Sequence, residues 1–127
     1  MNLVLVFVGG GAGAVARYLG GVAWMRLAGP AQPYLATAII NVLGGFLMGC
    51  LVGWLALRGA AGADRWRVLL GVGVLGGFTT FSSFSLEAVG MLQRKAYGVA
   101  GFYIGGSVLL SILALVLGLV LMRRVLA

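Results

Sequence analysis

The sequence predicts an all-α membrane protein with four transmembrane helices. Of its 127 residues, 62% are hydrophobic and only 9% are charged, whereas soluble domains carry about 25% charged residues. A water-soluble domain of this size has too little interior to bury so much apolar surface. Four apolar segments also reach the length of about 20 residues that a helix needs to cross a bilayer core. We therefore expect a single transmembrane domain over residues 1–127, with helices at residues 3–27, 34–57, 66–93 and 99–122.

The first predicted helix, residues 3–27, ends at the turn sequence AGPAQP, because Pro and Gly favour loops. No Lys or Arg precedes its apolar run, whereas a cleaved signal peptide has a basic segment there, so we expect a membrane helix. Arg17 lies near its middle, where a charge costs roughly 2.5–3.5 kcal/mol on insertion scales. Two interpretations of Arg17 stay open: it snorkels or pairs structurally, or it braces an interface or lends positive potential to an anion path.

The second predicted helix, residues 34–57, carries one amide side chain, Asn41, about a third of the way along. An amide in a membrane helix often only bridges two helices. Its N–H₂ group can equally donate hydrogen bonds to an anion. The single cysteine, Cys50, lies in the same apolar run, so the chain has no internal disulfide.

The third predicted helix, residues 66–93, contains the polar stretch GGFTTFSSFSLE. Its paired glycines and the β-branched Thr79 and Thr80 lower the helix propensity, which predicts a break at residues 76–80. A break deep in a membrane persists only where it is buried in protein or lines a cavity. Broken transporter helices also offer free carbonyl groups to cations. The break is therefore a candidate cation site.

Two faces follow this break along the third helix. Phe81 and Phe84 are three residues apart and share one face, while Thr80, Ser83 and Glu87 form a second, polar face. Phenylalanines in a membrane usually pack against lipid or a neighbouring helix. The edge of an aromatic ring also carries positive potential, so the alternative is that these rings face an anion.

The fourth predicted helix, residues 99–122, carries a hydroxyl stripe. Tyr103, Ser107 and Ser111 are spaced i, i+4 and i+8, so they share one helix face among Leu, Ile and Val. A single serine can bond back to its own helix. Three hydroxyls in register indicate instead a ladder of donors that passes a dehydrated anion from site to site.

Small residues and balanced charges indicate how the helices assemble. Pairs such as Gly9 with Gly13 and Gly45 with Gly49 form small helix faces, which favour close helix packing and an oligomer. One side of the membrane would hold five basic residues and the other three, or four if Arg17 is counted there. Because basic loops set orientation, this weak bias leaves open both a single topology and insertion in both orientations with antiparallel pairing.

Composition also limits the class of function. The net charge of +7 comes from basic residues at the ends of apolar segments, so phospholipid headgroups are expected neighbours and nucleic acid is not. The chain has no histidine, one Asp and one Glu. No nucleophile–base pair or metal-ligand set can be assembled from these residues, so we do not expect an enzyme.

The stretch GGFTTFSSFS closely resembles the signature GGxTTFSTFS of the Fluc (CrcB) fluoride channels, with Ser83 where that signature often has Thr. The resemblance extends to the four spans, the arginine of the first, NVLGG in the second and the Tyr-Ser-Ser stripe of the fourth. It implies passive, electrogenic fluoride efflux across the cell inner membrane through an antiparallel dual-topology homodimer with two pores. It further implies a structural Na⁺ at the dimer centre, bound by the main-chain carbonyls of Gly76 and Thr79.

The resemblance also implies roles for the remaining candidates. Phe81 and Phe84 line the fluoride path with their ring edges, and Glu87 lies near a pore vestibule. The expected polar lining of the pore is Asn41, Thr80, Ser83, Tyr103, Ser107 and Ser111. The alternative is a proton-coupled exporter of the small multidrug resistance type, which depends on a carboxylate in the first helix, where this chain has Arg17 and no acid. An accessory membrane subunit without transport is a third hypothesis, but it would not require the hydroxyl stripe.

Overall fold

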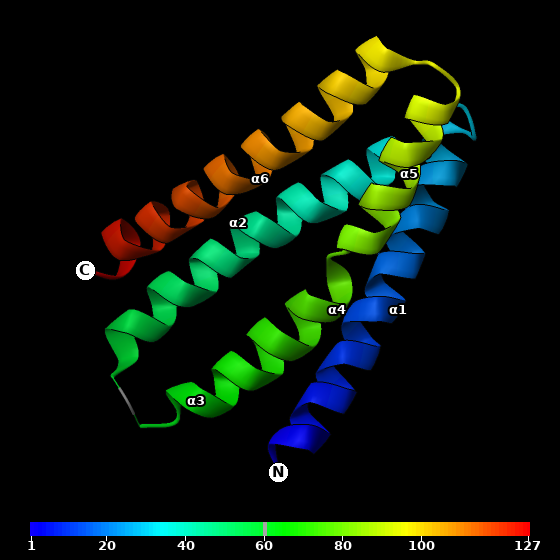
Figure 1. Cartoon of the computed structure of the whole chain (residues 1–127). Helices are drawn as coiled ribbons and strands as arrows, with labels where there is room; N and C mark the ends of the chain where they lie inside the picture. Colours follow the sequence, from blue (N-terminus) through cyan, green and yellow to red (C-terminus); the bar gives the residue numbers. More distant parts are fainter. Residues whose placement is uncertain (60) are drawn as a thin grey trace.

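The computed structural model describes residues 1–59 and 61–127, and these form helices joined by short turns (Figure 1). Four segments are long and apolar enough to cross a membrane, which confirms the predicted four-helix architecture. The third segment begins at Ala63, before the predicted start, and consists of four consecutive helical elements. The elements are α1 Asn2–Ala28, α2 Tyr34–Arg58, α3 Ala63–Trp66, η1 Arg67–Leu75, α4 Gly76–Phe78, α5 Phe81–Gln93 and α6 Tyr97–Leu126.

The helices pack mainly as two pairs. Helix α2 lies along α6, and α1 lies along η1 and α4, while α5 packs against the first part of α6 (Figure 1). Helices α1 and α2 both end at glycines with positive φ, Gly29 (φ 78°) and Gly59 (φ 76°). Glycine is favoured at helix ends of this kind because it has no Cβ to clash in that conformation. The two pairs diverge away from the start of α6 and leave grooves between them.

Glycine allows the close helix contacts within each pair. A Cβ added at Gly13 of α1 would overlap the carbonyl oxygen of Val74 in η1. A Cβ at Gly49 of α2 would overlap the carbonyl oxygen of Leu115 in α6. The missing side chains therefore let backbones touch, as small residues do in membrane helix pairs generally.

We expect Gly13→Ala to destabilise the fold by about 1–3 kcal/mol, because overpacking has this effect when the neighbouring atoms are backbone. Gly11→Ala is the matched control, since a Cβ there meets nothing within 4 Å. The thermal stability of the two variants in detergent, followed by loss of the monodisperse species, tests the prediction. Equal stability of the two variants would contradict the close α1–η1 contact.

Segment η1, residues Arg67–Leu75, is a nine-residue π-helix. No sequence pattern predicts it, because hydrophobic periodicity does not separate a π-helix from an α-helix in so short a segment. π-helical turns are rare and concentrate at functional sites. Here the π-helix leads directly into α4 and the break that follows it.

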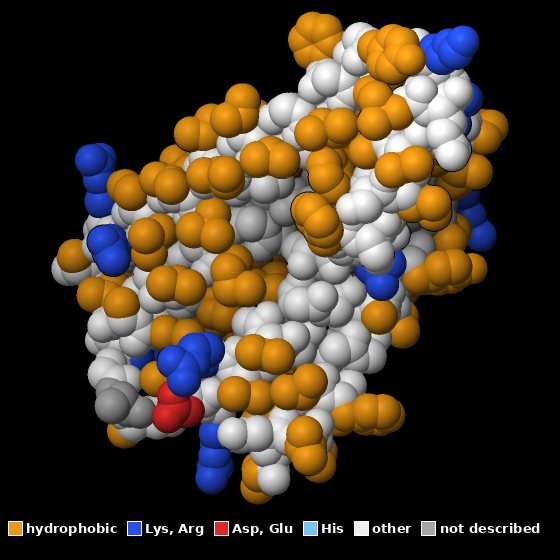
Figure 2. All heavy atoms as spheres, in the orientation of Figure 1, with side chains coloured by type: hydrophobic (Ala, Val, Ile, Leu, Met, Phe, Trp, Pro, Cys, Tyr) orange, Lys and Arg blue, Asp and Glu red, His pale blue; other side chains and the backbone are white. Residues whose placement is uncertain are grey.

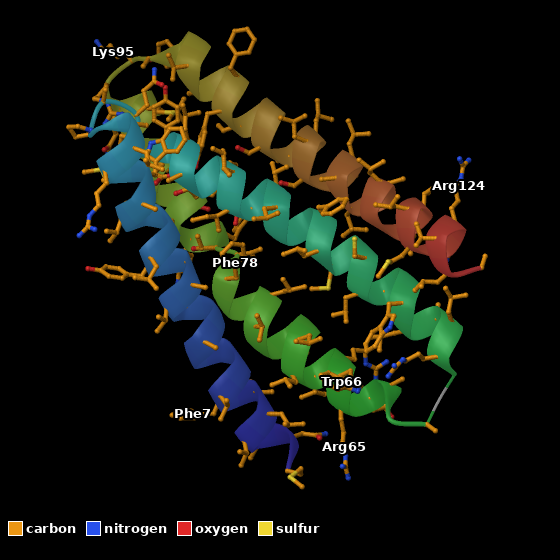
Figure 3. All side chains as sticks on the ribbon, turned by 180° about the vertical axis from the view of Figure 1, so that it is seen from behind. Phe7, Arg65, Trp66, Phe78, Lys95 and Arg124 are labelled. Carbon is orange, nitrogen blue, oxygen red and sulfur yellow. The ribbon has the colours of Figure 1, made fainter. Side chains whose placement is uncertain are left out.

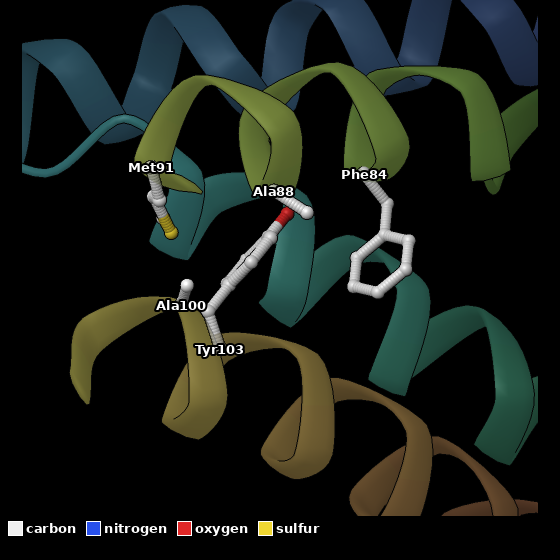
Figure 4. Close-up of a cluster of buried hydrophobic side chains, with 5 residues drawn as sticks. All are labelled: Phe84, Ala88, Met91, Ala100 and Tyr103. Atoms are coloured by element: carbon white, nitrogen blue, oxygen red, sulfur yellow. The ribbon is translucent and has the colours of Figure 1, made fainter. Parts of the chain in front are cut away.

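Large apolar side chains cover much of the molecular surface, and the buried core is small. Side chains such as Phe7 (83% exposed) and Phe102 (87% exposed) lie on the surface, and hydrophobic side chains cover much of the face seen in Figure 2. The buried cluster joins α5 to α6 and consists of Phe84, Ala88, Met91, Ala100 and Tyr103 (Figure 4). Such an apolar exterior is stable in lipid but not in water.

Candidate functional site

The third segment is interrupted at Thr79 and Thr80, within the residues 76–80 that the sequence favours for a break. Thr79 (φ −80°, ψ 156°) and Thr80 (φ −148°, ψ 116°) are extended, and α5 begins at Phe81. Asn41 of α2 holds this extended backbone with both halves of its amide. Its Nδ2 donates to the Thr80 carbonyl (3.0 Å), and its Oδ1 accepts from the Thr80 N–H (2.8 Å).

The break leaves the backbone carbonyls of residues 76–79 without their usual helical donors, and two of them, Gly76 and Thr79, are the carbonyls that the sequence resemblance implicates. In a continuous α-helix, the N–H of Thr80 would bond the Gly76 carbonyl and the N–H of Ser83 would bond the Thr79 carbonyl. Here the Thr80 N–H donates to Asn41, and the Ser83 N–H donates to Thr80 Oγ1 (3.2 Å), which caps α5. The carbonyl oxygens of Gly76 and Thr79 are therefore available to a hard cation, whose preferred ligands are oxygens.

Arg17 connects α1 to the same break. Its Nε donates to the Gly77 carbonyl (3.2 Å), just before the interruption. Arg17 also lines a cavity of about 720 Å³, here called the Arg17 cavity, together with Thr37, Thr80 and Ser83. The hydrogen bond of Arg17 supports the interpretation that it braces the contact between α1 and α4. Its positive charge lies beside a cavity whose lining is mainly apolar, with a few hydroxyl groups.

A groove of about 370 Å³, here called the Phe groove, brings together most of the candidates from α2, α5 and α6. Phe81 is 78% exposed, whereas Phe84 is buried; their ring centroids are 5.5 Å apart with an interplanar angle of 41°. The candidate residues in its lining are Asn41, Thr79, Thr80, Phe81, Phe84, Ser107 and Ser111. None of the lining side chains is charged, so an anion in the groove would meet amide, hydroxyl and aromatic groups among aliphatic side chains such as Met48 and Val108.

Ser107 is buried, and its Oγ has no hydrogen-bond partner in the described part of the chain. A buried hydroxyl without a partner is costly, so it calls for a further ligand or a neighbouring chain. Ser107 lines both the Phe groove and an adjoining cavity of about 580 Å³ that Tyr103 also lines. The stripe of hydroxyls on α6 thus continues from one cavity into the next.

Glu87 is held by two hydroxyl donors from different helices. Thr37 Oγ1 of α2 donates to its Oε1 (2.9 Å), and the Tyr103 hydroxyl of α6 donates to its Oε2. The Tyr103 ring packs in turn against Phe84, with centroids 5.2 Å apart, and against Tyr34. This network links the carboxylate to the wall of the Phe groove. Figure 4 shows Tyr103 reaching toward α5, between Ala88 and Phe84.

The structure divides the predicted set between two sides of the break. Arg17 and Ser83 line the Arg17 cavity, Thr80 lines both this cavity and the Phe groove, and Glu87 and Tyr103 form the network beside them. Sequence reasoning missed Thr37. It lies four residues before Asn41 and therefore on the same face of α2, which is the signal that would have found it.

A family model described as "CrcB-like protein, Camphor Resistance (CrcB)" matches residues 4–119, a range that includes every candidate residue named above. The chain is 60% identical over 126 residues to the protein named fluoride-specific ion channel FluC of Caulobacter vibrioides (strain NA1000 / CB15N), which covers 99% of this chain and 98% of that protein. It is 60% identical over 125 residues to the FluC of Phenylobacterium zucineum (strain HLK1), with 98% of each chain covered. It is 50% identical over 124 residues to the FluC of Agrobacterium fabrum (strain C58 / ATCC 33970), again with 98% of each covered.

Proposed function

Because this chain belongs to the CrcB family, we propose that it is a fluoride-selective channel through which fluoride leaves the cytoplasm passively. It is a multi-pass membrane transport protein and not an enzyme. The observation that carries the mechanism is the Phe groove, where uncharged donors from three helices converge. A small, strongly hydrated anion needs several donors to replace its water shell, but a fixed positive charge would trap it.

The groove supplies these donors in sequence along its wall. Ser107 and Ser111 present hydroxyl groups, and Asn41 retains one amide N–H beyond the bond it makes to Thr80. The edges of Phe81 and Phe84 add positive potential without a formal charge. Arg17 and Glu87 lie beside the groove rather than in its lining, so they shape the local field at the approaches.

A second copy of the chain completes the pore in this proposal. Phe81 is 78% exposed in a single chain, so a neighbouring chain is expected to cover it at the mouth of the groove. An antiparallel two-fold dimer would place a second copy against this face. Because a two-fold axis duplicates every site, such a dimer has two Phe grooves and hence two pores.

The same two-fold assembly would create a cation site at the break. The Gly76 and Thr79 carbonyls of two chains would provide four backbone oxygens for a structural Na⁺, which neutralises the partial negative charge of the facing carbonyls. No group of three or more His, Cys, Asp or Glu side chains occurs among the residues that the structure describes, so a cation here rests on backbone oxygens. The extended Thr79–Thr80 backbone, which Asn41 fixes, holds these oxygens in place and would lie near the middle of the membrane.

In the cell inner membrane, a fluoride channel would lower the concentration of fluoride in the cytoplasm. In an acidic medium, fluoride enters the cell as neutral HF. The HF then dissociates to fluoride because the cytoplasmic pH is higher than that of the medium. The negative interior then expels the anion through any passive path. A channel without proton coupling is therefore sufficient for protection against fluoride.

Fluoride efflux from liposomes that contain the purified protein tests this function. We expect fluoride to leave only when a potassium ionophore balances the charge, because the flux is electrogenic, and we expect chloride to stay inside under the same conditions. Flux that requires a proton gradient would favour the alternative of a proton-coupled exporter. Equal flux of chloride and fluoride would refute selectivity.

We expect Thr37→Val to lower fluoride flux about tenfold, because a hydrogen bond to a carboxylate contributes about 1.5–3 kcal/mol and Val cannot donate one to Glu87 Oε1. The change preserves the shape of the side chain, so the protein should still fold. Thr37→Ser, which keeps the hydroxyl, is the control and should retain most of the flux. The liposome assay above measures both variants, and wild-type flux in Thr37→Val would show that the network has no part in conduction.

A further inference from the structure

The end of the molecule that carries the α2–α3 turn and the C-terminus is strongly basic. Five arginines lie in the turn region and the last turn of α6: Arg58, Arg65, Arg67, Arg123 and Arg124. The only acid in these segments is Asp64, and it pairs with Arg67 (2.8 Å). Figure 2 shows basic side chains gathered at this end, with the one acidic group beside them. Such an excess of positive charge complements an anionic surface.

Arg58 is held in a particular orientation at this end. Its guanidinium carbon lies 4.4 Å from the centroid of the Trp54 ring, and Trp54 packs edge-to-face on Trp66 with centroids 6.0 Å apart. A guanidinium that stacks on an aromatic face keeps its N–H groups free along its edge, where they can bind phosphate oxygens in pairs. Tryptophans are also enriched at the level of lipid headgroups.

An apolar groove of about 420 Å³ extends from Trp54 between α2 and η1. Its lining includes Leu47 and Cys50 of α2, Leu70 and Val74 of η1, and Met122 of α6. From Trp54 to Leu47 the helix rises about 10 Å, at 1.5 Å per residue, which matches a segment of an acyl chain. Figure 3, the view from behind, shows α2 and η1 with their side chains, and labels Trp66 at the outer end of the third segment.

This groove is separate from the Phe groove. Helix α2 contributes Asn41, Gly45 and Met48 to the Phe groove, but Leu47, Cys50 and Trp54 to the apolar groove. The two linings share no residue, and at 100° per residue their α2 members are centred about 120° apart around the helix. A molecule in the apolar groove therefore leaves the proposed pore open.

We propose that this groove binds one anionic phospholipid, with its phosphate on Arg58 and one acyl chain between α2 and η1 beside Cys50. The groove has an apolar lining that includes Trp54, and Arg58 stacks on Trp54, so the groove and the arginine match the two parts of such a lipid in order. Because the end of the molecule is basic, the site prefers phosphatidylglycerol to phosphatidylcholine. The proposal concerns binding and does not depend on fluoride conduction.

Quenching of tryptophan fluorescence by brominated acyl chains tests the proposal. In a Trp24→Phe background, the emission comes from Trp54 and Trp66 alone. The protein is reconstituted in equal mixtures of phosphatidylglycerol and phosphatidylcholine, with bromine on the chains of one lipid or the other. We expect brominated phosphatidylglycerol to quench more strongly. Both leaflets have the same composition, so the result does not depend on orientation.

Arg58→Gln and Arg124→Gln distinguish a defined site from a generally basic surface. We expect Arg58→Gln to lower the preference for phosphatidylglycerol about tenfold, because it removes charge-assisted hydrogen bonds to the phosphate in addition to one positive charge. Arg124→Gln, at the same end but without an aromatic partner among the described residues, should keep the preference. Equal quenching by the two lipids in the parent protein, equal losses in the two variants, or displacement of the lipid by inorganic phosphate alone would each overturn the proposal.

Discussion

We expect Phe84→Ile to lower fluoride flux at least about tenfold while the protein stays folded. Isoleucine keeps much of the apolar volume at this buried position but has no ring edge to present to an anion. Phe84 also connects the two parts of the site, because its ring lies 5.5 Å from that of Phe81 and 5.2 Å from that of Tyr103. Loss of the Phe84 ring therefore removes an anion contact and also removes the packing of that ring against Tyr103.

Phe81→Ile should suppress flux as well, for a simpler reason. Its ring is 78% exposed in the single chain, so it contributes little to the folding of that chain, and its loss should act on the pore alone. Phe7→Ile is the matched control, since Phe7 lies on α1, is 83% exposed and lines no part of the site. Fluoride flux in liposomes and elution from a sizing column separate conduction from assembly. Wild-type flux in either Phe81→Ile or Phe84→Ile would refute the pore role of that ring.

Asn41→Asp is the second change with a large expected effect, and it should impair both stability and conduction. The aspartate would keep the oxygen that accepts from the Thr80 N–H but would lose the donor to the Thr80 carbonyl. Two oxygens would then face each other, and the unsatisfied carbonyl costs about 1–3 kcal/mol. A negative charge in the lining of the Phe groove would also repel fluoride, so we expect flux to be lost.

Asn2→Asp gives the same chemical change at an exposed position at the start of α1 and serves as the control. It should leave stability and flux unchanged or slightly improve stability, because an acid is favourable at a helix N-terminus. Thermal unfolding in detergent measures the first effect of Asn41→Asp and liposome efflux the second. If Asn41→Asp and Asn2→Asp behaved alike, the role assigned to Asn41 at the break would be wrong.

The helices could be predicted from the sequence because membrane spans depend on local composition and length. Lipid leaves each backbone no partner except its own helix, so a run of apolar residues such as Tyr34–Arg58 has one stable conformation. Paired glycines and threonines lower local helix propensity, and this is the sequence signal for an interruption of the third segment. The π-helix of η1 could not be predicted from the sequence, since its hydrogen-bond register does not change the pattern of apolar residues.

The tertiary hydrogen bonds of the site were beyond sequence reasoning. The sequence leaves two interpretations of Asn41 open, a bridge between helices and a donor to an anion, and the structure shows a bridge from α2 to Thr80, 39 residues away. Which residues share one helix face follows from spacing; which helix that face meets does not. Thr37 was missed for the same reason. It shares a helix face with Asn41, but its role as a hydrogen-bond donor to Glu87 becomes visible only when α2 and α5 are placed together.

The reversal potential of single channels between solutions of unequal fluoride and unequal chloride tests the central claim most directly. If the Phe groove is a passive fluoride pore, the current should reverse at the equilibrium potential of fluoride and should stay there when the pH of one side is changed. A reversal potential that follows chloride would show that the groove does not select fluoride. One that moves with the pH gradient would show coupled transport and contradict the channel.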